Sequence, residues 1–177
     1  FIVWVVKIDF PGGRSNRSGS HTELIQTLDQ LIHAAEVLQP AYQGIFVTTF
    51  VPWALKILQT TGIKMIETSL EHRIRRGLLE IFKIITSIAE PMKAFLEDLM
   101  KALMQILNDD NEENAVLVIH ILIDLHKVHR AALEPYAQQL IEYVLAGFDN
   151  FPEVCETVFE VLHLLVIYFL TEVAYIS

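Results

Sequence analysis

Residues 108–127 read NDDNEENAVLVIHILIDLHK, and this stretch decides the fold. Its acidic first part predicts a helix start, because Asp110 followed three residues later by Glu113 fits a capping box, in which side chains satisfy free backbone N–H groups. Carboxylates in a first turn also suit the positive end of the helix dipole. From Ala115 to Leu125 only His120 and Asp124 are strongly polar. A helix that is apolar on almost every side has to be enclosed by neighbouring helices.

The composition of the chain limits the classes of protein that it can represent. Its 177 residues carry a net charge of −9, and 53% of them are hydrophobic, which is enough for one domain with a substantial core. No stretch reaches the roughly 18 to 20 apolar residues that a membrane span needs, so we expect no membrane partner. The acidic balance argues against direct binding of nucleic-acid phosphates. A single cysteine, Cys155, excludes an internal disulfide and favours a reducing compartment.

The rest of the chain predicts helices joined by short turns. Capping boxes at residues 20–23 and 68–71 predict two helix starts, and Glu-Pro or Phe-Pro pairs predict three more. Helices joined so closely must be roughly antiparallel. We expect a kink or an interruption near Pro52, because proline cannot donate a helical hydrogen bond. The predicted helices cover residues 20–38, 41–59, 68–88, 90–107, 111–130, 134–148 and 151–177.

An internal repeat sets the predicted architecture. When the chain is shifted by 44 residues, Pro91 falls on Pro135, and each is preceded by Glu. Leu78, Leu79, Ile81 and Ile84 then fall on Leu122, Ile123, Leu125 and Val128, and the pair Glu80 and Lys83 falls on Asp124 and Lys127. A further shift keeps only the apolar positions. A two-helix unit of about 40 to 47 residues is typical of HEAT and armadillo repeats. The sequence therefore predicts an all-α protein, a HEAT-type α-solenoid of antiparallel helix pairs, with a plain helical bundle as the alternative.

The repeat also predicts how the chain is divided. Residues 1–20 precede the repeats. Within them, we expect residues 1–10 to form an apolar segment, either a strand or the tail of a helix, and residues 11–20 to form a flexible linker. The HEAT-like repeats occupy residues 21–177, at about 21–60, 68–107 and 111–149, with the start of a further repeat at 152–177. Each helix pair is incomplete alone and needs its neighbours to bury its apolar face. The high apolar content and a first residue other than Met are expected of a fragment of a larger chain.

Four candidate ligands for a metal gather on the organising helix: His120, Asp124, His126 and His129. They follow no HExxH spacing, and no cysteine pair accompanies them. We therefore expect His126 to pack between repeats and the other three to face water. A small helical enzyme that uses these four residues is the alternative hypothesis.

Other motifs of catalysis and binding are absent from the sequence. No Gly-Lys-Ser or Gly-Lys-Thr forms a P-loop, and a calcium loop starting at Asp109 would have Asn114 and His120 where Gly and Glu are required. Cys155 stands between acidic residues, which disfavours a reactive thiolate. The basic residues at 73, 75, 76 and 83 are expected to form a solvated face. The sequence predicts no catalytic, metal or cofactor site, and hence a protein that is not an enzyme.

Two runs of residues resemble a known family. The run Asp110-Asn111-Glu112-Glu113-Asn114, followed by Ile123-Asp124-Leu125-His126-Lys127, is similar to the "NEEN … I-I-D/E-L-H-K" sequence in the amino-terminal HEAT region of the TRRAP family. Leu78-Leu79-Glu80-Ile81-Phe82 also resembles that family's "L-V-L-E-I-I" helix. The resemblance continues more weakly over residues 42–159. His129-Arg130-Ala131-Ala132 departs from a more basic, proline-containing family stretch, which puts any partner contact there in doubt.

This resemblance implies a function. The TRRAP family consists of pseudokinase scaffolds of histone acetyltransferase complexes, whose kinase-like domain is inactive and lies far from this region. It implies a nuclear, non-catalytic scaffold that binds subunits of a coactivator complex and segments of transcription activators. The motif residues would then be structural. The alternative is a HEAT-repeat carrier such as a nuclear-transport receptor, which would bind a small GTPase and cargo reversibly.

Overall fold

The computed structural model describes residues 17–63, 69–129 and 134–136, together with residues 138, 139, 142 and 163. Within these residues the protein is helical and contains no strand, so the all-α prediction is confirmed. The helices are α2 (Arg17–Glu36), α3 (Pro40–Thr60), α4 (Leu70–Ile85), α5 (Ala89–Met92), α6 (Leu96–Asp109) and α7 (Glu112–Val128), with 3-10 turns at Lys93–Phe95 and Glu134–Tyr136. The predicted segment 1–10, most of the last two predicted helices, and Cys155 lie outside the described residues.

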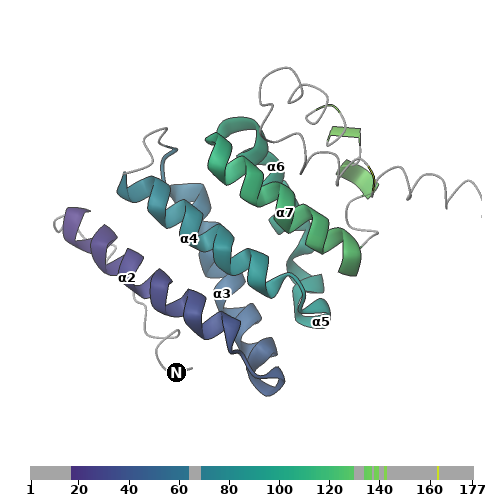
Figure 1. Ribbon diagram of the computed structural model, residues 1–177, viewed down its shortest axis with the longest axis horizontal. Coiled ribbons are helices and arrows are strands. Elements are labelled where there is room, and N and C mark those ends of the chain that lie inside the picture. Colours follow the sequence, from purple (N-terminus) through teal and green to yellow (C-terminus); the bar gives the residue numbers. More distant parts are fainter. Residues whose placement is uncertain are drawn as a thin grey trace, which may run out of the picture.

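The helices lie in two layers. Figure 1 shows α2, α4 and α7 side by side in one layer, and α2 packs on α4 as α4 packs on α7. Behind them α3 contacts α5 and α6, and α6 in turn packs on α7. Helices of consecutive pairs thus contact their counterparts in the next pair. A row of stacked helix pairs has this arrangement, because each pair covers the apolar face of its neighbour.

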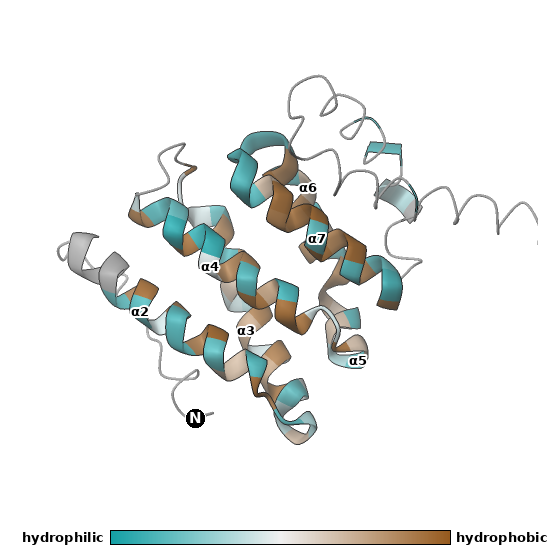
Figure 2. Cartoon of the chain, viewed as in Figure 1, coloured by the Kyte–Doolittle hydropathy of each residue, from teal (hydrophilic) through white to brown (hydrophobic). Residues whose placement is uncertain are grey.

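The apolar core follows the repeat that the sequence indicates. Leu78, Leu79 and Ile81 on α4 are completely buried, and so, to within 6% exposure, are their counterparts Leu122, Ile123 and Leu125 on α7. The fourth pair lies at the margin of the core, where Val128 is 39% exposed. In Figure 2, α7 is coloured as hydrophobic along most of its length, whereas α2 and α4 alternate between hydrophilic and hydrophobic residues. This agrees with an α7 that neighbours enclose on several sides.

One of the two predicted charged pairs forms as expected. The ammonium group of Lys127 lies 2.9 Å from a carboxylate oxygen of Asp124. Glu80 instead accepts a hydrogen bond from Arg76, at 3.1 Å, and not from Lys83. The partner of Glu80 thus lies four residues before it on α4, and Arg76 also pairs with Glu113 of α7.

Several predicted helix boundaries are wrong. Helix α2 begins at Arg17, so Ser20 lies inside the helix and not at its start. Helix α4 begins one residue later than the predicted box, because the hydroxyl of Ser69 accepts the N–H of His72 at 3.1 Å. The helix predicted at residues 90–107 is divided, since the backbone of Phe95 (φ −115°, ψ −1°) departs from helical geometry. Segments rich in Ser, Thr and Asp offer several capping residues, and packing selects among them.

Pro52 does not interrupt the helix in which it lies. Helix α3 runs from Pro40, its first residue, through Pro52 without a break. Val51, which precedes Pro52, and Ala54, which lies two residues after it, are completely buried. Their burial stabilises the turn in which Pro52 removes a backbone donor, so tertiary packing overrides the local preference.

Two close contacts fix how α4 sits between its neighbours. A Cβ atom on Gly77 would lie 3.4 Å from the side chain of Leu28, an ordinary van der Waals distance, so α2 packs directly on α4 at this position. On the other side, the rings of Phe50 on α3 and Phe82 on α4 meet edge to face, with centroids 5.5 Å apart. None of the helices that the structure describes is long and apolar enough to cross a bilayer.

Candidate functional site

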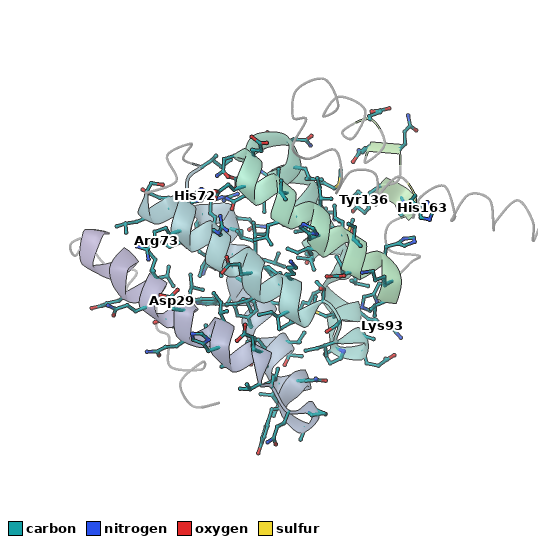
Figure 3. All side chains as sticks on the ribbon, viewed as in Figure 1. Asp29, His72, Arg73, Lys93, Tyr136 and His163 are labelled. Carbon is teal, nitrogen blue, oxygen red and sulfur yellow. The ribbon has the colours of Figure 1, made fainter. Side chains whose placement is uncertain are left out.

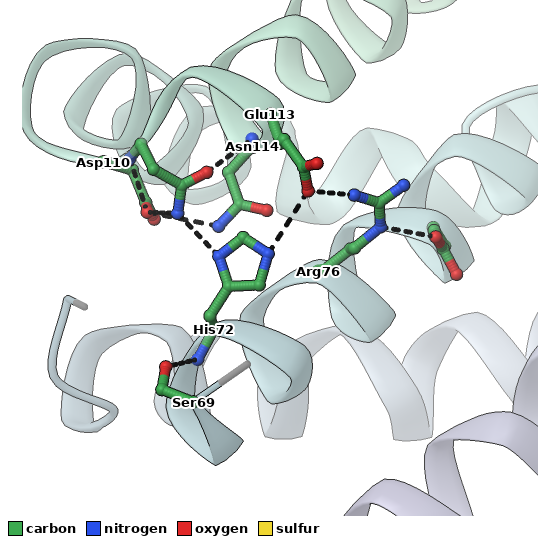
Figure 4. A network of polar contacts seen from close by, with 8 residues as sticks. Ser69, His72, Arg76, Asp110, Glu113 and Asn114 are labelled. Carbon is green, nitrogen blue, oxygen red and sulfur yellow. Dashed lines mark hydrogen bonds and ion pairs between the residues drawn. The ribbon is translucent and has the colours of Figure 1, made fainter. Parts of the chain in front are cut away.

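The acidic motif lies at the connection between α6 and α7 and faces the first turns of α4. Figure 4 shows part of the cluster that meets there, with His72, Arg76, Asp110, Glu113 and Asn114 labelled. We call this cluster the polar joint, and it consists of His72, Arg75 and Arg76 from α4, Asp110 and Asn111 from the α6–α7 connection, and Glu113 and Asn114 from the first turn of α7.

Asp110 is the centre of the polar joint, and its side chain is 0% exposed. Its Oδ2 accepts a hydrogen bond from Nε of Arg75 at 2.6 Å. Its Oδ1 accepts three more, from the backbone N–H and the Nδ2 of Asn111 at 2.9 Å each and from the Nδ2 of Asn114 at 3.1 Å. A buried carboxylate is tolerated only when it is paired and hydrogen-bonded, and this one has four donors.

Arg75 connects Asp110 to a third helix. Its side chain is 4% exposed, and its Nη1 donates to the backbone carbonyls of Leu58 at 2.8 Å and Thr61 at 3.1 Å, at the end of α3. The last carbonyls of a helix lack partners within the helix, and a cation there also suits the negative end of the dipole. A single guanidinium therefore joins the end of α3, the first turns of α4 and the start of α7.

Asn111 caps α7 and donates a hydrogen bond to a buried histidine. Its Oδ1 accepts the N–H of Asn114 at 3.0 Å, so its Nδ2 is the atom that lies 2.8 Å from Nδ1 of His72. An amide nitrogen only donates, so Nδ1 of His72 accepts this hydrogen bond. Nε2 lies 3.4 Å from the carboxylate of Glu113. The imidazole, which is 2% exposed, thus contacts both Asn111 and Glu113 at the start of α7.

The predicted capping box of Asp110 and Glu113 is therefore wrong. Asn111 is the capping residue, and Asp110 points instead to Arg75, which is 35 residues earlier in the chain. Glu113 pairs with Arg76 and His72 of α4 instead of folding back on its own helix. Arg76 and Glu113 are 46% and 42% exposed, so their pair contributes little to stability.

The two halves of the family motif lie at opposite ends of α7. Glu112 is exposed in the first turn, whereas Asp124, Leu125, His126 and Lys127 occupy the last two turns. Twelve residues of helix separate Glu112 from Asp124, about 18 Å along the axis. Leu125 is completely buried, His126 is half-buried, and Asp124 pairs with Lys127. Only the first half of the motif belongs to the polar joint, and its partners His72 and Arg75 were not recognised from the sequence.

The histidines do not gather into a metal site. His120 is half-buried, and His129, which was expected to face water, is 7% exposed. Within the described residues, no three His, Cys, Asp or Glu side chains are placed to hold a metal ion. Burial lowers the pKa of His129, and the charge of Lys93 lowers it further, against the opposing effect of Glu90.

The basic stretch on α4 also differs from the expected solvated face. Arg75 is buried, and only Arg73, Arg76 and Lys83 are exposed. A hollow of about 130 Å³ lies between α2 and α4, with Arg73 and Arg76 on one side and Asp29 on the other. Figure 3 labels Asp29 and Arg73 on these two neighbouring helices. The aliphatic side chains of Ile25, Leu28 and Ile32 also line the hollow.

We expect Arg75→Ala to destabilise the chain by about 3–5 kcal/mol, because it leaves the Asp110 carboxylate buried without its cation and frees two carbonyls of α3. Chemical denaturation of the full chain, followed by circular dichroism, measures this change. Lys101→Ala is the matched control, since it removes the exposed pair with Glu97, and should leave the midpoint unchanged. Equal effects of the two substitutions would contradict the importance of the buried pair.

We also expect the burial of His129 to make the fold sensitive to acid. Because its pKa is lower in the folded chain, the unfolded chain binds more protons as the pH falls through its ordinary pKa near 6.5. His129 therefore destabilises the fold progressively below that pH and has no effect above it. His129→Gln should flatten the decline of unfolding free energy between pH 7 and pH 5. The same slope in both chains would show that His129 is not responsible.

Comparison with known proteins shows where such a helical segment occurs. No family profile matches the chain, and no solved structure matches it. It is 27% identical over 144 residues, 81% of its length, to the probable transcription-associated protein 1 of Dictyostelium discoideum. It is 27% identical over 148 residues (82%) to transcription-associated protein 1 of Drosophila melanogaster. It is 26% identical over 139 residues (73%) to Tra1, a SAGA complex/NuA4 acetyltransferase complex subunit of Schizosaccharomyces pombe.

The chain spans only 3–4% of the length of these relatives. The aligned part nevertheless covers most of this chain, in three distant organisms. The acidic motif and the Leu125-His126-Lys127 run indicated a resemblance to the TRRAP family, and these comparisons confirm it. This chain is related in sequence to a segment of the TRRAP and Tra1 transcription-associated proteins.

Proposed function

We propose that this chain is a non-catalytic helical-repeat segment of a scaffold in a histone acetyltransferase coactivator complex in the nucleus. The observation that carries this proposal is the similarity of 73% of the chain to Tra1, which is a subunit of the SAGA and NuA4 acetyltransferase complexes. In this proposal the segment belongs to the amino-terminal HEAT region of a much longer parent. Its partners are subunits of the complex and segments of transcription activators.

The chemistry of the polar joint supports a structural role for the family motif. The side chains of Asp110 and Asn111 hydrogen-bond to Arg75 and His72 of α4. The guanidinium of Arg75 donates to the carboxylate of Asp110 and to two backbone carbonyls of the α3 end. A catalytic carboxylate or histidine needs a free atom near a substrate, whereas these groups are engaged with one another. We infer that the motif keeps consecutive helix pairs in place, so that the stack presents a continuous surface.

The shape of the segment supports partner binding over a surface. Stacked helix pairs form extended surfaces that receive partner helices or unfolded peptides. The polar outer faces of α2 and α4 belong to such a surface, and charged side chains on both helices line the hollow between them.

Purification of the tagged full-length parent from its own cells tests this function. We expect a histone acetyltransferase to co-purify with it in a constant ratio. The parent carrying Arg75→Ala should retain fewer subunits than the parent carrying Lys101→Ala, because only the first change weakens the joint between helix pairs. Recovery of a small GTPase and a cargo protein that GTP releases, without an acetyltransferase, would indicate a transport receptor and refute the proposal.

A further inference from the structure

The apolar side chains between α4 and α7 determine only weakly how the two helices align along their axes. The buried residues of α4 are mostly Ile and Leu, and those of α7 are Val, Ile and Leu at nearly every position from 118 to 125. Sliding α7 by one turn would replace one aliphatic side chain by another of similar volume. Cores tolerate such exchanges at small cost, so aliphatic burial alone discriminates little between neighbouring registers.

The polar joint is different, because it is satisfied in one register only. The carboxylate of Asp110 has to lie 2.6 Å from Nε of Arg75, while Nδ2 of Asn111 lies 2.8 Å from Nδ1 of His72. A shift of one helical turn moves these groups about 5 Å apart. It would leave the buried carboxylate without its cation and the imidazole without its donor, which is costly in a water-excluded site.

Arg75 extends this constraint to the preceding helix pair. Its Nη1 is held by two carbonyls at the end of α3, so the guanidinium cannot follow Asp110 if α7 slides. The position 44 residues after Arg75 is Ile119, which is buried and apolar. The sequence pattern thus places this charged group in one repeat and not in the next.

From these observations we propose that the pair of Arg75 and Asp110 is a register lock: it selects one sliding position of α7 on α4, and the aliphatic faces supply the attraction between the helices. Buried polar groups are known to select the register of coiled coils in this way, at a cost in stability. The lock determines how one helix pair follows the next. It does not depend on what the assembled surface binds.

Spin labels on both helices test the lock directly in the full chain. Lys83 and Glu112 are exposed and lie outside the polar joint, so each is replaced by a labelled cysteine, with Cys155→Ala in every sample. Double electron–electron resonance then measures the distance between α4 and α7. The otherwise unaltered chain should give one distance.

Two conservative variants weaken the lock. Arg75→Lys keeps the charge without the forked donors, and Asp110→Asn keeps an acceptor oxygen without the charge. In both, we expect a second distance displaced by about 5 Å, one helical turn. The population of this second distance should rise by about tenfold or more over that in the unaltered chain. Lys101→Gln, which removes an exposed pair on α6, should give the single distance of the unaltered chain.

Either of two outcomes would overturn the proposal. A single unchanged distance in both variants, with cooperative unfolding preserved, would show that the aliphatic faces set the register alone. Loss of the helical signal and of cooperative unfolding in both conservative variants would show that the pair is required for the helices to associate at all, which is a different role.

Discussion

One buried ion pair holds the described part of this molecule in its arrangement. Arg75 and Asp110 are 4% and 0% exposed, and between them they contact the end of α3, the first turns of α4 and the start of α7. The guanidinium lies where α3 ends and the carboxylate where α7 begins, so each charge also suits the dipole of a neighbouring helix.

Different side chains thus hold the helices together and set their alignment. Aliphatic side chains form most of the buried faces of α4 and α7, and their burial stabilises the stack without much directional preference. The polar joint adds few contacts but strict geometry, since a buried ion pair is strongly unfavourable when one partner is displaced. This division agrees with the position of the acidic run directly before the apolar helix α7.

Much of the fold follows from periodicity in the sequence. The 44-residue shift identified equivalent buried positions on α4 and α7, and the pair of Asp124 and Lys127, because these features depend on local spacing. The choice between Asp110 and Asn111 as the cap of α7 did not follow, since Arg75 decides it from 35 residues away. One signal did point to Arg75. It lies three, four and seven residues before Leu78, Leu79 and Phe82, which places it on the apolar face of α4.

A double-mutant cycle on Arg75 and Asp110 tests the central claim most directly. The unfolding free energies of the full chain, of Arg75→Ala, of Asp110→Ala and of the double variant give the coupling between the two side chains. If the ion pair joins the helices as described, the double variant should lose much less than the sum of the single losses, with a coupling of about 2 kcal/mol or more. Losses that add to within about 0.5 kcal/mol would show that the two residues act independently, and would contradict the account.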